Sequence, residues 1–376
     1  MKKIIIFYAS YGGGHLSAAK SVESYLKNNY TDLDVELIDC IKYINKTIDK
    51  VSTTAYREMA KIMPWAWGKI YNDSQKGALA HISSRANSFM AIKLLKLLRE
   101  KNPDVVISTH PFGSQMCSYL KRKGKIDCKI ATILTDFKSH DQWLVGSNEM
   151  DYFFVSNENM KQELIEKNIE TSKIFVTGIP VSEKFLINYN KEEILENLNF
   201  SKDKKTVLFF AGGEYGIGKN KTLSVFESLV KYFDNIQIIA ISGRNENMKN
   251  SFIKIVFENN KQDSVCIFEY TDKVAEFMNI ADLVVTKPGG LTTTESLVSE
   301  VPMIVINPIP GQEEENAEFL EKHQVAAWIK KDDDVIFVLN DLLNDTNKLD
   351  LFKNNIKLIS KPNSTKNICD TILKSI

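Results

Sequence analysis

The sequence predicts an α/β protein built from two doubly wound units, each a parallel sheet with helices on both faces. Short apolar runs alternate with longer amphipathic stretches along the chain, which is typical of such sheets. The pattern restarts at the apolar run Lys205–Gly213, which ends in glycines as the first run does. The length of 376 residues is enough for two hydrophobic cores.

The first half opens with the isoleucine-rich run Lys2–Ser10, which has the length of a buried parallel strand. Apolar residues then recur at helical spacing, at Leu16, Ala19, Val22 and Leu26. Between Tyr43 and Leu98 no strand is evident. Further strands are predicted at Asp34–Cys40, Asp104–His110, Cys128–Thr135, Asp151–Ser156 and Lys173–Gly178.

The second half repeats this organisation. The polar stretch Asn188–Lys205 carries the boundary, so we predict a first domain over 1–185 and a second over 186–360. A last helix over 361–376 would pack on the first domain, although the residues alone do not decide this. Strands are predicted at Lys205–Gly213, Ile236–Ser242, Ser264–Tyr270, Asp282–Lys287, Val301–Asn307 and Val325–Lys330.

Composition excludes several classes of protein. Lys+Arg and Asp+Glu both number 48, so the net charge is zero and a globally basic nucleic-acid binder is disfavoured. The five cysteines are scattered without a CxxC pair, which predicts reduced thiols in a cytosolic protein. The run Ile4–Ser10 is far shorter than the ~20 apolar residues of a spanning helix and lacks a cleavage-site pattern. If the protein acts on lipid, we expect it to lie on the membrane surface.

The first glycine turn, Gly12–Gly14, stands between the first strand and the first helix. A helix N-terminus attracts anions, and Gly13 and Gly14 would let a ligand approach the backbone. The alternative is a tight turn without a ligand. His15 follows at the helix start, where a neutral imidazole could accept a proton. The alternative for His15 is a structural or simply exposed side chain.

The second glycine turn, Gly212–Asn220, nearly matches a phosphate-binding P-loop. Residues 213–219 fit GxxxxGK, but Asn220 stands where Ser or Thr would bind magnesium. An NTPase is therefore disfavoured, and Gly213 and Gly216 are expected to contact a phosphate or an acceptor without a metal.

The third glycine turn lies within Asp282–Leu297, which reads as strand, turn and helix. Gly289, Gly290 and the N–H groups that follow them could hold a diphosphate. Glu295 could accept hydrogen bonds from a ribose diol; its alternative is a favourable charge near a helix N-terminus. Downstream, Gln312, Glu313 and Asn316 have the chemistry to bind sugar hydroxyls; an acidic solvated helix start is the alternative.

Together these motifs resemble a known family, the processive diacylglycerol glucosyltransferases of bacteria. Plant monogalactosyldiacylglycerol synthases are close relatives, and the transferase that adds N-acetylglucosamine to the peptidoglycan lipid intermediate is a more distant one. The resemblance covers nearly the whole chain, and KPGG…TxxE followed by GQExxN is its most specific part. It is carried by GGGH (12–15), THPF (109–112), TDFKSHDQW (135–143), TGIPV (177–181), GGEYGIG (212–218), KPGGLTTTES (287–296) and PGQEEENAEF (310–319).

The resemblance implies a GT-B fold, in which two Rossmann-like domains face a cleft. The C-terminal domain would hold the UDP-sugar and the N-terminal domain the lipid acceptor. Glu295 would bind the ribose. The other donor-binding residues would be Gly13, Gly14, Gly213, Gly216, Lys287, Gly289, Gly290, Thr292, Thr293, Gln312, Glu313 and Asn316. His15 is the candidate base, Asp136 and His140 would orient the acceptor or the base, and His110 would contact the acceptor. Whether His15 or Asp136 is the base stays open.

The resemblance also implies the reaction. We expect an inverting enzyme that transfers a hexose from UDP-glucose or UDP-galactose to diacylglycerol, once or processively, without a metal or other cofactor. One alternative is a UDP-N-acetylglucosamine-dependent transferase that acts on a polyprenyl-linked acceptor. Another is a UDP-sugar-binding regulator without turnover. The choice of hexose, the number of sugars added and the oligomeric state stay open.

The stretch Met59–Tyr71 breaks the strand–helix alternation and is rich in side chains that favour a membrane interface. Met63, Trp65 and Trp67 are its candidate lipid contacts, and its lysines would attract anionic lipid. The alternative is an ordinary packed helix. We expect a peripheral protein on the cytoplasmic face of the cell membrane.

Overall fold

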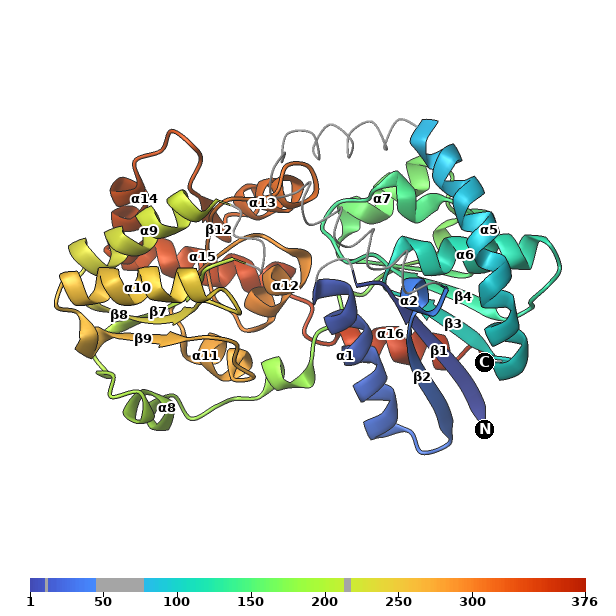
Figure 1. The fold of residues 1–376 in the computed structure, drawn as a ribbon, viewed down its shortest axis with the longest axis horizontal. Coiled ribbons are helices and arrows are strands. Elements are labelled where there is room, and N and C mark those ends of the chain that lie inside the picture. The colour runs from blue at the N-terminus through green and yellow to red at the C-terminus, as the bar shows by residue number, and fades with distance from the viewer. Residues whose placement is uncertain (11–12, 45–77, 213–217) are drawn as a thin grey trace. The chain divides into compact units, whose positions relative to one another are not determined.

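The computed structural model describes residues 1–10, 13–44, 78–212 and 218–376, with side chains of the helix that begins at Ala78 described from residue 90 onward. Two compact units emerge. The first comprises Met1–Glu183, Pro310–Gln312 and Lys361–Ile376, and the second comprises Lys184–Ile309 and Glu313–Ser360. Each contains a six-stranded parallel sheet flanked by helices (Figure 1), so the predicted α/β class is confirmed.

In the first unit the strands run in the order β2-β1-β3-β4-β5-β6, all parallel. Every strand predicted in the first half is confirmed. Their bounds are β1 Lys2–Tyr8, β2 Leu33–Asp39, β3 Val105–Ser108, β4 Lys129–Ile133, β5 Tyr152–Val155 and β6 Ile174–Val176.

Side chains of β1 point alternately to the two faces of this sheet. Ile4 and Ile6 join the core formed with α1 and α16, whereas Ile5 and Phe7 join the core formed with α2, α5, α6 and α7. Both faces are therefore covered, which explains why the strands read as continuous apolar runs. The helices are α1 Gly13–Asn29, α2 Cys40–Ile44, α5 Ala78–Lys101, α6 Pro111–Arg122, α7 Glu158–Glu166 and α16 Ser364–Leu373, with 3-10 helices η1 Asp141–Leu144, η2 Ser147–Glu149 and η3 Thr171–Lys173.

Helix α16 is held to the first unit by buried hydrogen bonds. The Thr365 hydroxyl donates to the Val181 carbonyl at 2.8 Å and accepts from the Val181 N–H at 3.1 Å. The Tyr30 hydroxyl donates to the Asp370 carboxylate at 3.1 Å. Together with the apolar contacts of Ile368 and Ile372, these bonds make α16 part of the first core.

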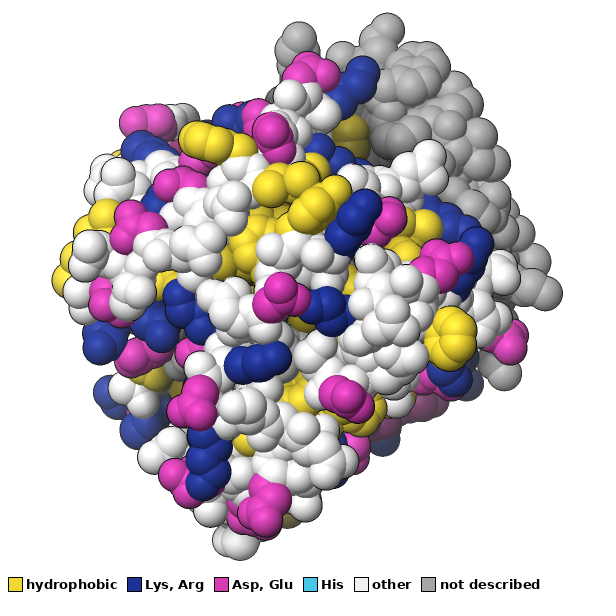
Figure 2. All heavy atoms as spheres, turned by 90° about the vertical axis from the view of Figure 1, so that its left-hand side faces the viewer, with side chains coloured by type: hydrophobic (Ala, Val, Ile, Leu, Met, Phe, Trp, Pro, Cys, Tyr) yellow, Lys and Arg dark blue, Asp and Glu magenta, His cyan; other side chains and the backbone are white. Residues whose placement is uncertain are grey.

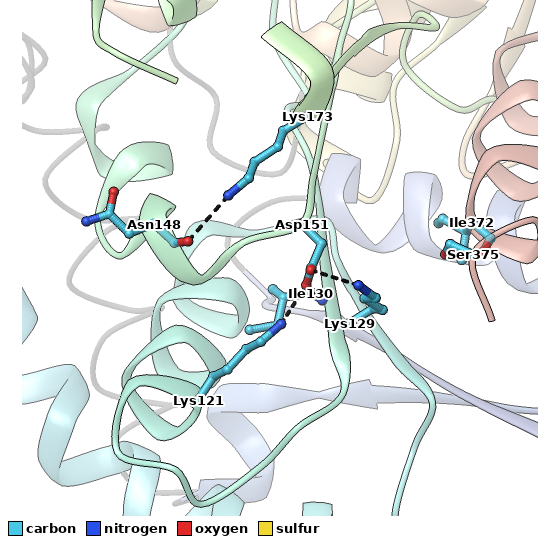
Figure 3. A network of polar contacts seen from close by, with 8 residues as sticks. All are labelled: Lys121, Lys129, Ile130, Asn148, Asp151, Lys173, Ile372 and Ser375. Carbon is cyan, nitrogen blue, oxygen red and sulfur yellow. Dashed lines mark hydrogen bonds and ion pairs between the residues drawn. The ribbon is translucent and has the colours of Figure 1, made fainter. Parts of the chain in front are cut away.

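A cluster of charges around Asp151 ties α6 to β4 and β5 (Figure 3). Its carboxylate accepts hydrogen bonds from Lys121 Nζ at 2.7 Å, Lys129 Nζ at 3.3 Å and the Ile130 N–H at 2.9 Å. Burial alone would raise the pKa of Asp151, but these hydrogen bonds and the two lysine charges outweigh it and hold the pKa below its usual range. The side chain is therefore ionised at neutral pH.

In the second unit the strand order is β12-β11-β10-β7-β8-β9, again parallel throughout. The six predicted strands are confirmed here as well. Their bounds are β7 Lys205–Phe210, β8 Ile236–Ile241, β9 Val265–Phe268, β10 Leu283–Thr286, β11 Met303–Val305 and β12 Ala326–Trp328. The helices are α8 Lys191–Asn197, α9 Lys219–Tyr232, α10 Glu246–Glu258, α11 Val274–Ile280, α12 Gly290–Val298, α13 Gln312–Lys322, α14 Val335–Leu343 and α15 Thr346–Ile359, with 3-10 helices η4 Glu183–Leu186 and η5 Gln262–Ser264.

Figure 2 shows one face of the second unit, where Lys and Arg side chains are interspersed with Asp and Glu around a group of apolar side chains. Charges of both signs on this face do not produce the single-sign field typical of nucleic-acid-binding surfaces. Among the helices that the structure describes, none is both long and apolar enough to cross a membrane.

Candidate functional site

Each sheet has one point at which the strand order reverses. In the first unit, β1 lies between β2 and β3, and in the second unit, β7 lies between β8 and β10. Ligands of open parallel sheets bind outside the carboxyl ends of the strands at such points. His15 lies at the start of the helix that follows β1, and His110 lies in the turn after β3. In the second unit, the turns after β7 and β10 contain Gly212 and Lys287.

His15 lies in the first turn of α1, and its ring is fixed by contacts to two other strand ends. The Nδ1 atom is 2.6 Å from the Thr109 carbonyl oxygen and 3.2 Å from the Thr135 hydroxyl. A carbonyl oxygen can only accept, so Nδ1 carries the hydrogen and Nε2 keeps a lone pair. Burial lowers the pKa of His15 to about 4, although the Thr109 bond raises it in part. The imidazole is therefore neutral at pH 7.

His110 packs edge-on against His15, with ring centroids 4.7 Å apart. It is also the N-cap of α6, because its Nδ1 accepts the Phe112 N–H at 3.3 Å. That bond places the ring hydrogen on Nε2. Burial, and secondarily the neighbouring His15, hold the pKa of His110 well below its usual value. Two neutral histidines thus lie side by side, and their charged forms disfavour each other.

Asp136 and His140 follow the same edge after β4. Asp136 is buried, with 6% of its surface exposed, and its carbonyl accepts the Ser156 hydroxyl at 2.8 Å. His140 Nδ1 accepts the Gln142 N–H at 3.1 Å and caps η1. Four sequence-predicted residues, His15, His110, Asp136 and His140, therefore follow strands at the carboxyl edge of the first sheet, and His15 and His110 are in direct contact.

Gly13, before His15, has open space beside it. A Cβ atom added at Gly13 would meet no heavy atom of the described residues within 4 Å. Gly13 and Gly14 form the first turn of α1, so their N–H groups have no partner four residues earlier within the helix. A ligand could approach the backbone there.

In the second unit, Lys287 extends across Gly212. A Cβ atom at Gly212, where φ is +86°, would lie 3.1 Å from Lys287 Cε and 3.9 Å from Nζ. Across the part of the chain that the structure describes, Nζ has neither a hydrogen bond nor an ion pair. Burial lowers the pKa of Lys287, and the Glu313 charge raises it in part. A largely buried ammonium that forms no ion pair is costly, so this position favours an anionic ligand.

The N-terminus of α12 lies beside this lysine in the sequence and begins after Gly289, its N-cap. The Thr294 hydroxyl bonds back to the Gly290 carbonyl at 2.7 Å. The Thr293 hydroxyl is fully buried and finds no partner among the described residues. Thr292 is partly exposed. Free N–H groups at this end of the helix add a partial positive charge to that of Lys287.

Glu295 lies in the second turn of α12 and is largely enclosed. Burial raises its pKa to about 8, so the free protein holds most of it in the protonated form at neutral pH. A ligand that donates hydrogen bonds to this carboxyl would favour the ionised form.

Helix α13 begins with Gln312, which is grouped with the first unit, and contributes Glu313 and Asn316 to the second unit. Glu313 accepts the Ile309 N–H at 2.6 Å, and its other oxygen is 3.9 Å from where a Cβ of Gly289 would lie. Burial raises the pKa of Glu313, and the Lys287 charge opposes this. Asn316 is fully buried and donates to the Pro288 carbonyl at 3.0 Å, which fixes the turn before α12.

Sequence reasoning missed three residues of these edges. Thr109 and Thr135 hold His15, and Asn307, with φ +47°, donates from Nδ2 to the Gly218 carbonyl and the Thr222 hydroxyl, each at 3.0 Å. The strand-end position of all three was visible in the sequence, but their partners were not. Gly213, Gly216, Met63, Trp65 and Trp67 lie outside the described residues. Among the described residues, no group of three or more His, Cys, Asp or Glu side chains is arranged to hold a metal ion.

Comparison with known proteins gave matches along the whole chain. The family model for monogalactosyldiacylglycerol (MGDG) synthase matches residues 15–181, and that for UDP-N-acetylglucosamine 2-epimerase matches residues 147–373. The chain is 30% identical over 377 residues to the processive diacylglycerol beta-glucosyltransferase of Bacillus mycoides, covering 99% of this chain and 93% of the relative. The corresponding enzyme of Bacillus cereus (strain G9842) gives the same identity and coverage.

Solved structures show the same fold. MurG of Acinetobacter baumannii superposes with a TM-score of 0.66 at 14% identity, covering 100% of both chains. The UDP-GlcNAc 2-epimerase of Neisseria meningitidis, solved with UDP-GlcNAc bound, superposes with a TM-score of 0.65 at 14% identity, also over 100% of both chains. At these identities the likeness concerns the fold, and it supports the GT-B architecture expected from the sequence.

Proposed function

Because this chain belongs to the family of bacterial diacylglycerol glycosyltransferases, we propose that it transfers glucose from UDP-glucose to diacylglycerol with inversion at the anomeric carbon. The chain is a UDP-sugar-dependent hexosyltransferase of that family. The glucosyltransferase relatives that match over nearly their full length support glucose as the hexose. The name of these relatives also supports repeated transfer, in which the first glycolipid becomes the acceptor of a second sugar.

The observation that carries the proposal is the state of His15. Its Nδ1–H is bound to the Thr109 carbonyl, so the lone pair of Nε2 is available. Burial keeps the ring neutral at the pH at which such an enzyme works. This favours His15 over Asp136 as the base that takes the proton of the acceptor hydroxyl. A positioned general base contributes about 10²–10⁴-fold to such reactions.

The donor is proposed to bind the second unit. Its diphosphate would meet Lys287, the Thr293 hydroxyl and the first N–H groups of α12, which lack partners among the described residues. Glu295 would accept the ribose hydroxyls and become ionised. Gln312 and Glu313 would contact the hexose, and Asn316 would hold the Pro288 turn in place. Fixed positive charge at the diphosphate lowers the barrier because negative charge develops on the leaving UDP.

The proposed step is a single displacement. The acceptor oxygen forms a bond to the anomeric carbon while the bond from that carbon to the β-phosphate oxygen breaks. The electron pair of that bond leaves with UDP, and the hydroxyl proton passes to His15 Nε2. Attack opposite the leaving group inverts the anomeric centre.

Diacylglycerol resides in a bilayer, so the chain is proposed to act as a peripheral protein on the cytoplasmic face of the cell membrane. The segment Met59–Tyr71, with Met63, Trp65 and Trp67, is the proposed contact with lipid. Its tryptophans favour the membrane interface, and Lys61 and Lys69 would add attraction to anionic headgroups.

A donor panel tests the proposal. The protein is incubated with vesicles that contain diacylglycerol and anionic lipid, and with UDP-glucose, UDP-galactose or UDP-N-acetylglucosamine in turn. We expect UDP release and glycolipid with UDP-glucose, products of one and more sugars, and a β-linkage by NMR. Preference for another donor would refute glucose. UDP release only with a polyprenyl-linked acceptor would favour the alternative transferase, and binding without release would favour a regulator.

A further inference from the structure

Thr109 touches His15 twice, in opposite directions. Its carbonyl accepts the His15 Nδ1–H at 2.6 Å, and its hydroxyl donates to the His15 carbonyl at 2.8 Å. The threonine is completely buried, and its N–H bonds the Phe7 carbonyl at 3.0 Å at the end of β1. One residue therefore clasps both the ring and the main chain of His15, although 94 positions separate them in the sequence.

Thr135 faces the same ring nitrogen from the end of β4. Its hydroxyl is 3.2 Å from His15 Nδ1, and only 3% of the residue is exposed. Nδ1 thus faces a carbonyl oxygen and a hydroxyl oxygen, both uncharged. The other ring nitrogen, Nε2, is the one that a ligand at this edge of the first unit would contact.

We propose that Thr109 and Thr135 are positioning residues for His15: they fix its Nδ1–H tautomer and direct the lone pair of Nε2 to the acceptor hydroxyl. This assignment rests on the proposed transferase reaction and extends it. When Nε2 takes the proton, both oxygens still accept the Nδ1–H, so the imidazolium forms without moving the ring. Two neutral acceptors therefore perform the orienting task for which many enzymes use a carboxylate.

The tautomer can be tested without any substrate. With ¹⁵N-labelled histidine, the shifts and couplings of the His15 ring distinguish protonated Nδ1 from protonated Nε2, and His15→Asn identifies the signals. We expect protonated Nδ1 in the native chain. In Thr135→Val, which keeps the shape and removes the hydroxyl, the Nδ1–H signal should shift and exchange faster with solvent. Protonated Nε2 in the native chain would overturn the inference.

Kinetics supplies the second readout. Loss of one neutral hydrogen bond corresponds to about a 2- to 10-fold change. We expect Thr135→Val to lower kcat by about that factor at unchanged KM for UDP-glucose, and Thr135→Ser to restore it. Thr109→Val removes the bond to the His15 carbonyl, and the expected loss in kcat is larger, about 10-fold, with recovery in Thr109→Ser.

Thr132→Val is the matched control, because Thr132 is a buried threonine of β4 whose hydroxyl pairs with Ser114 at 3.2 Å and not with His15. It should reproduce any loss of thermal stability without the change at Nδ1. Equal kcat losses in Thr132→Val and Thr135→Val would overturn the inference. Native chain that shows the Nδ1–H tautomer but transfers no glucose would refute the proposed function and not the tautomer.

Discussion

The polar groups at the carboxyl edges of the two sheets differ in whether they have hydrogen-bond or ion-pair partners. On the first, the ring nitrogens that contact the protein are paired: Nδ1 of His15 with Thr109, and Nδ1 of His110 with the Phe112 N–H. On the second, Lys287 feels the Glu313 charge but forms no ion pair with any described residue, and the buried Thr293 hydroxyl likewise finds no hydrogen-bond partner among those residues.

This difference separates two tasks. A base must be oriented and uncharged before its substrate arrives, so its hydrogen bonds are made within the protein. A site binds a dianion most tightly when its positive groups are not already held in ion pairs. Otherwise the dianion would have to displace the partner of each positive group. The first edge suits proton transfer, and the second suits a phosphate ligand.

Replacing His15 by Ala tests the first half of this comparison and should have the largest effect. We expect kcat to fall about 10²–10⁴-fold because the proposed general base is lost. UDP binding, measured by calorimetry, should change by less than about 2-fold, because His15 belongs to the other unit. A large loss of UDP affinity would contradict the separation of tasks.

Replacing Lys287 by Met tests the second half. Hydrogen bonds to charged groups contribute about 1.5–3 kcal/mol, so the Kd for UDP should rise about 10- to 100-fold. Uridine binding should not change, and UMP should show an intermediate effect. Lys287→Arg keeps the charge and serves as the control. Equal losses for UDP and uridine would show that Lys287 supports the fold of the turn and not a phosphate.

The protonation of Glu295 predicts how the stability of the chain depends on pH, which tests the second edge further. Its pKa is about 8 in the folded chain and about 4.5 in its usual state, so the folded chain holds a proton that the unfolded chain has lost between these values. The contribution of Glu295 to the free energy of unfolding is therefore most favourable below about pH 4.5. It falls as the pH rises to about 8. Glu295→Gln should have a higher Tm than the native chain at pH 8, and the difference should shrink at pH 5. Native and variant curves that stay parallel would contradict the raised pKa.

UDP binding gives a separate readout of the same group. If the ribose hydroxyls bind the ionised carboxylate, binding at pH 7 should release a proton. Calorimetry in two buffers of different ionisation enthalpy measures that proton directly. Glu295→Gln should bind UDP without proton release.

Asp151→Asn should have the smallest effect on activity. It serves as a reference for a charge that stabilises the fold and takes no part in the reaction. The low pKa of Asp151 contributes stability at neutral pH that is lost as pH falls through its usual value and below. We expect the variant to lose about 1–3 kcal/mol of unfolding free energy at pH 7 and less near pH 3, with kcat unchanged. A fall in kcat at a temperature where the variant is folded would link this cluster to the site.

The fold was predictable because buried parallel strands are apolar along their whole length. Runs such as Lys2–Tyr8 and Lys205–Phe210 stand out for that reason. Glycine turns after β1, β7 and β10 indicated the carboxyl edges, which is where open parallel sheets in general bind ligands. The roles given to single residues there stay predictions, and those of Met63, Trp65 and Trp67 fall on residues that the structure does not describe.

Contacts between distant strand ends were not predictable. Nothing near Thr109 in the sequence reveals that it clasps His15, because the contact exists only once β1 and β3 are neighbours. The sequence predicted that His110 contacts the lipid acceptor, and the structure shows in addition that it caps α6. The sequence predicted that Asn316 binds a sugar, whereas in the structure its side chain donates to the Pro288 carbonyl. Single-sequence reasoning finds the residue types at an edge, and tertiary pairing decides what each contacts.

The seating of α16 beside α1 has a consequence for synthesis of the chain. Ile368 and Ile372 fill the same core as Ile4 and Val22, yet the ribosome makes them only after the entire second unit. Until then, part of one apolar face of the nascent first sheet stays uncovered, because, of the other described helices, α1 alone packs on it, and exposed apolar surface is prone to aggregation. The unit that the ribosome makes first can therefore complete its core only after the second unit has been synthesised.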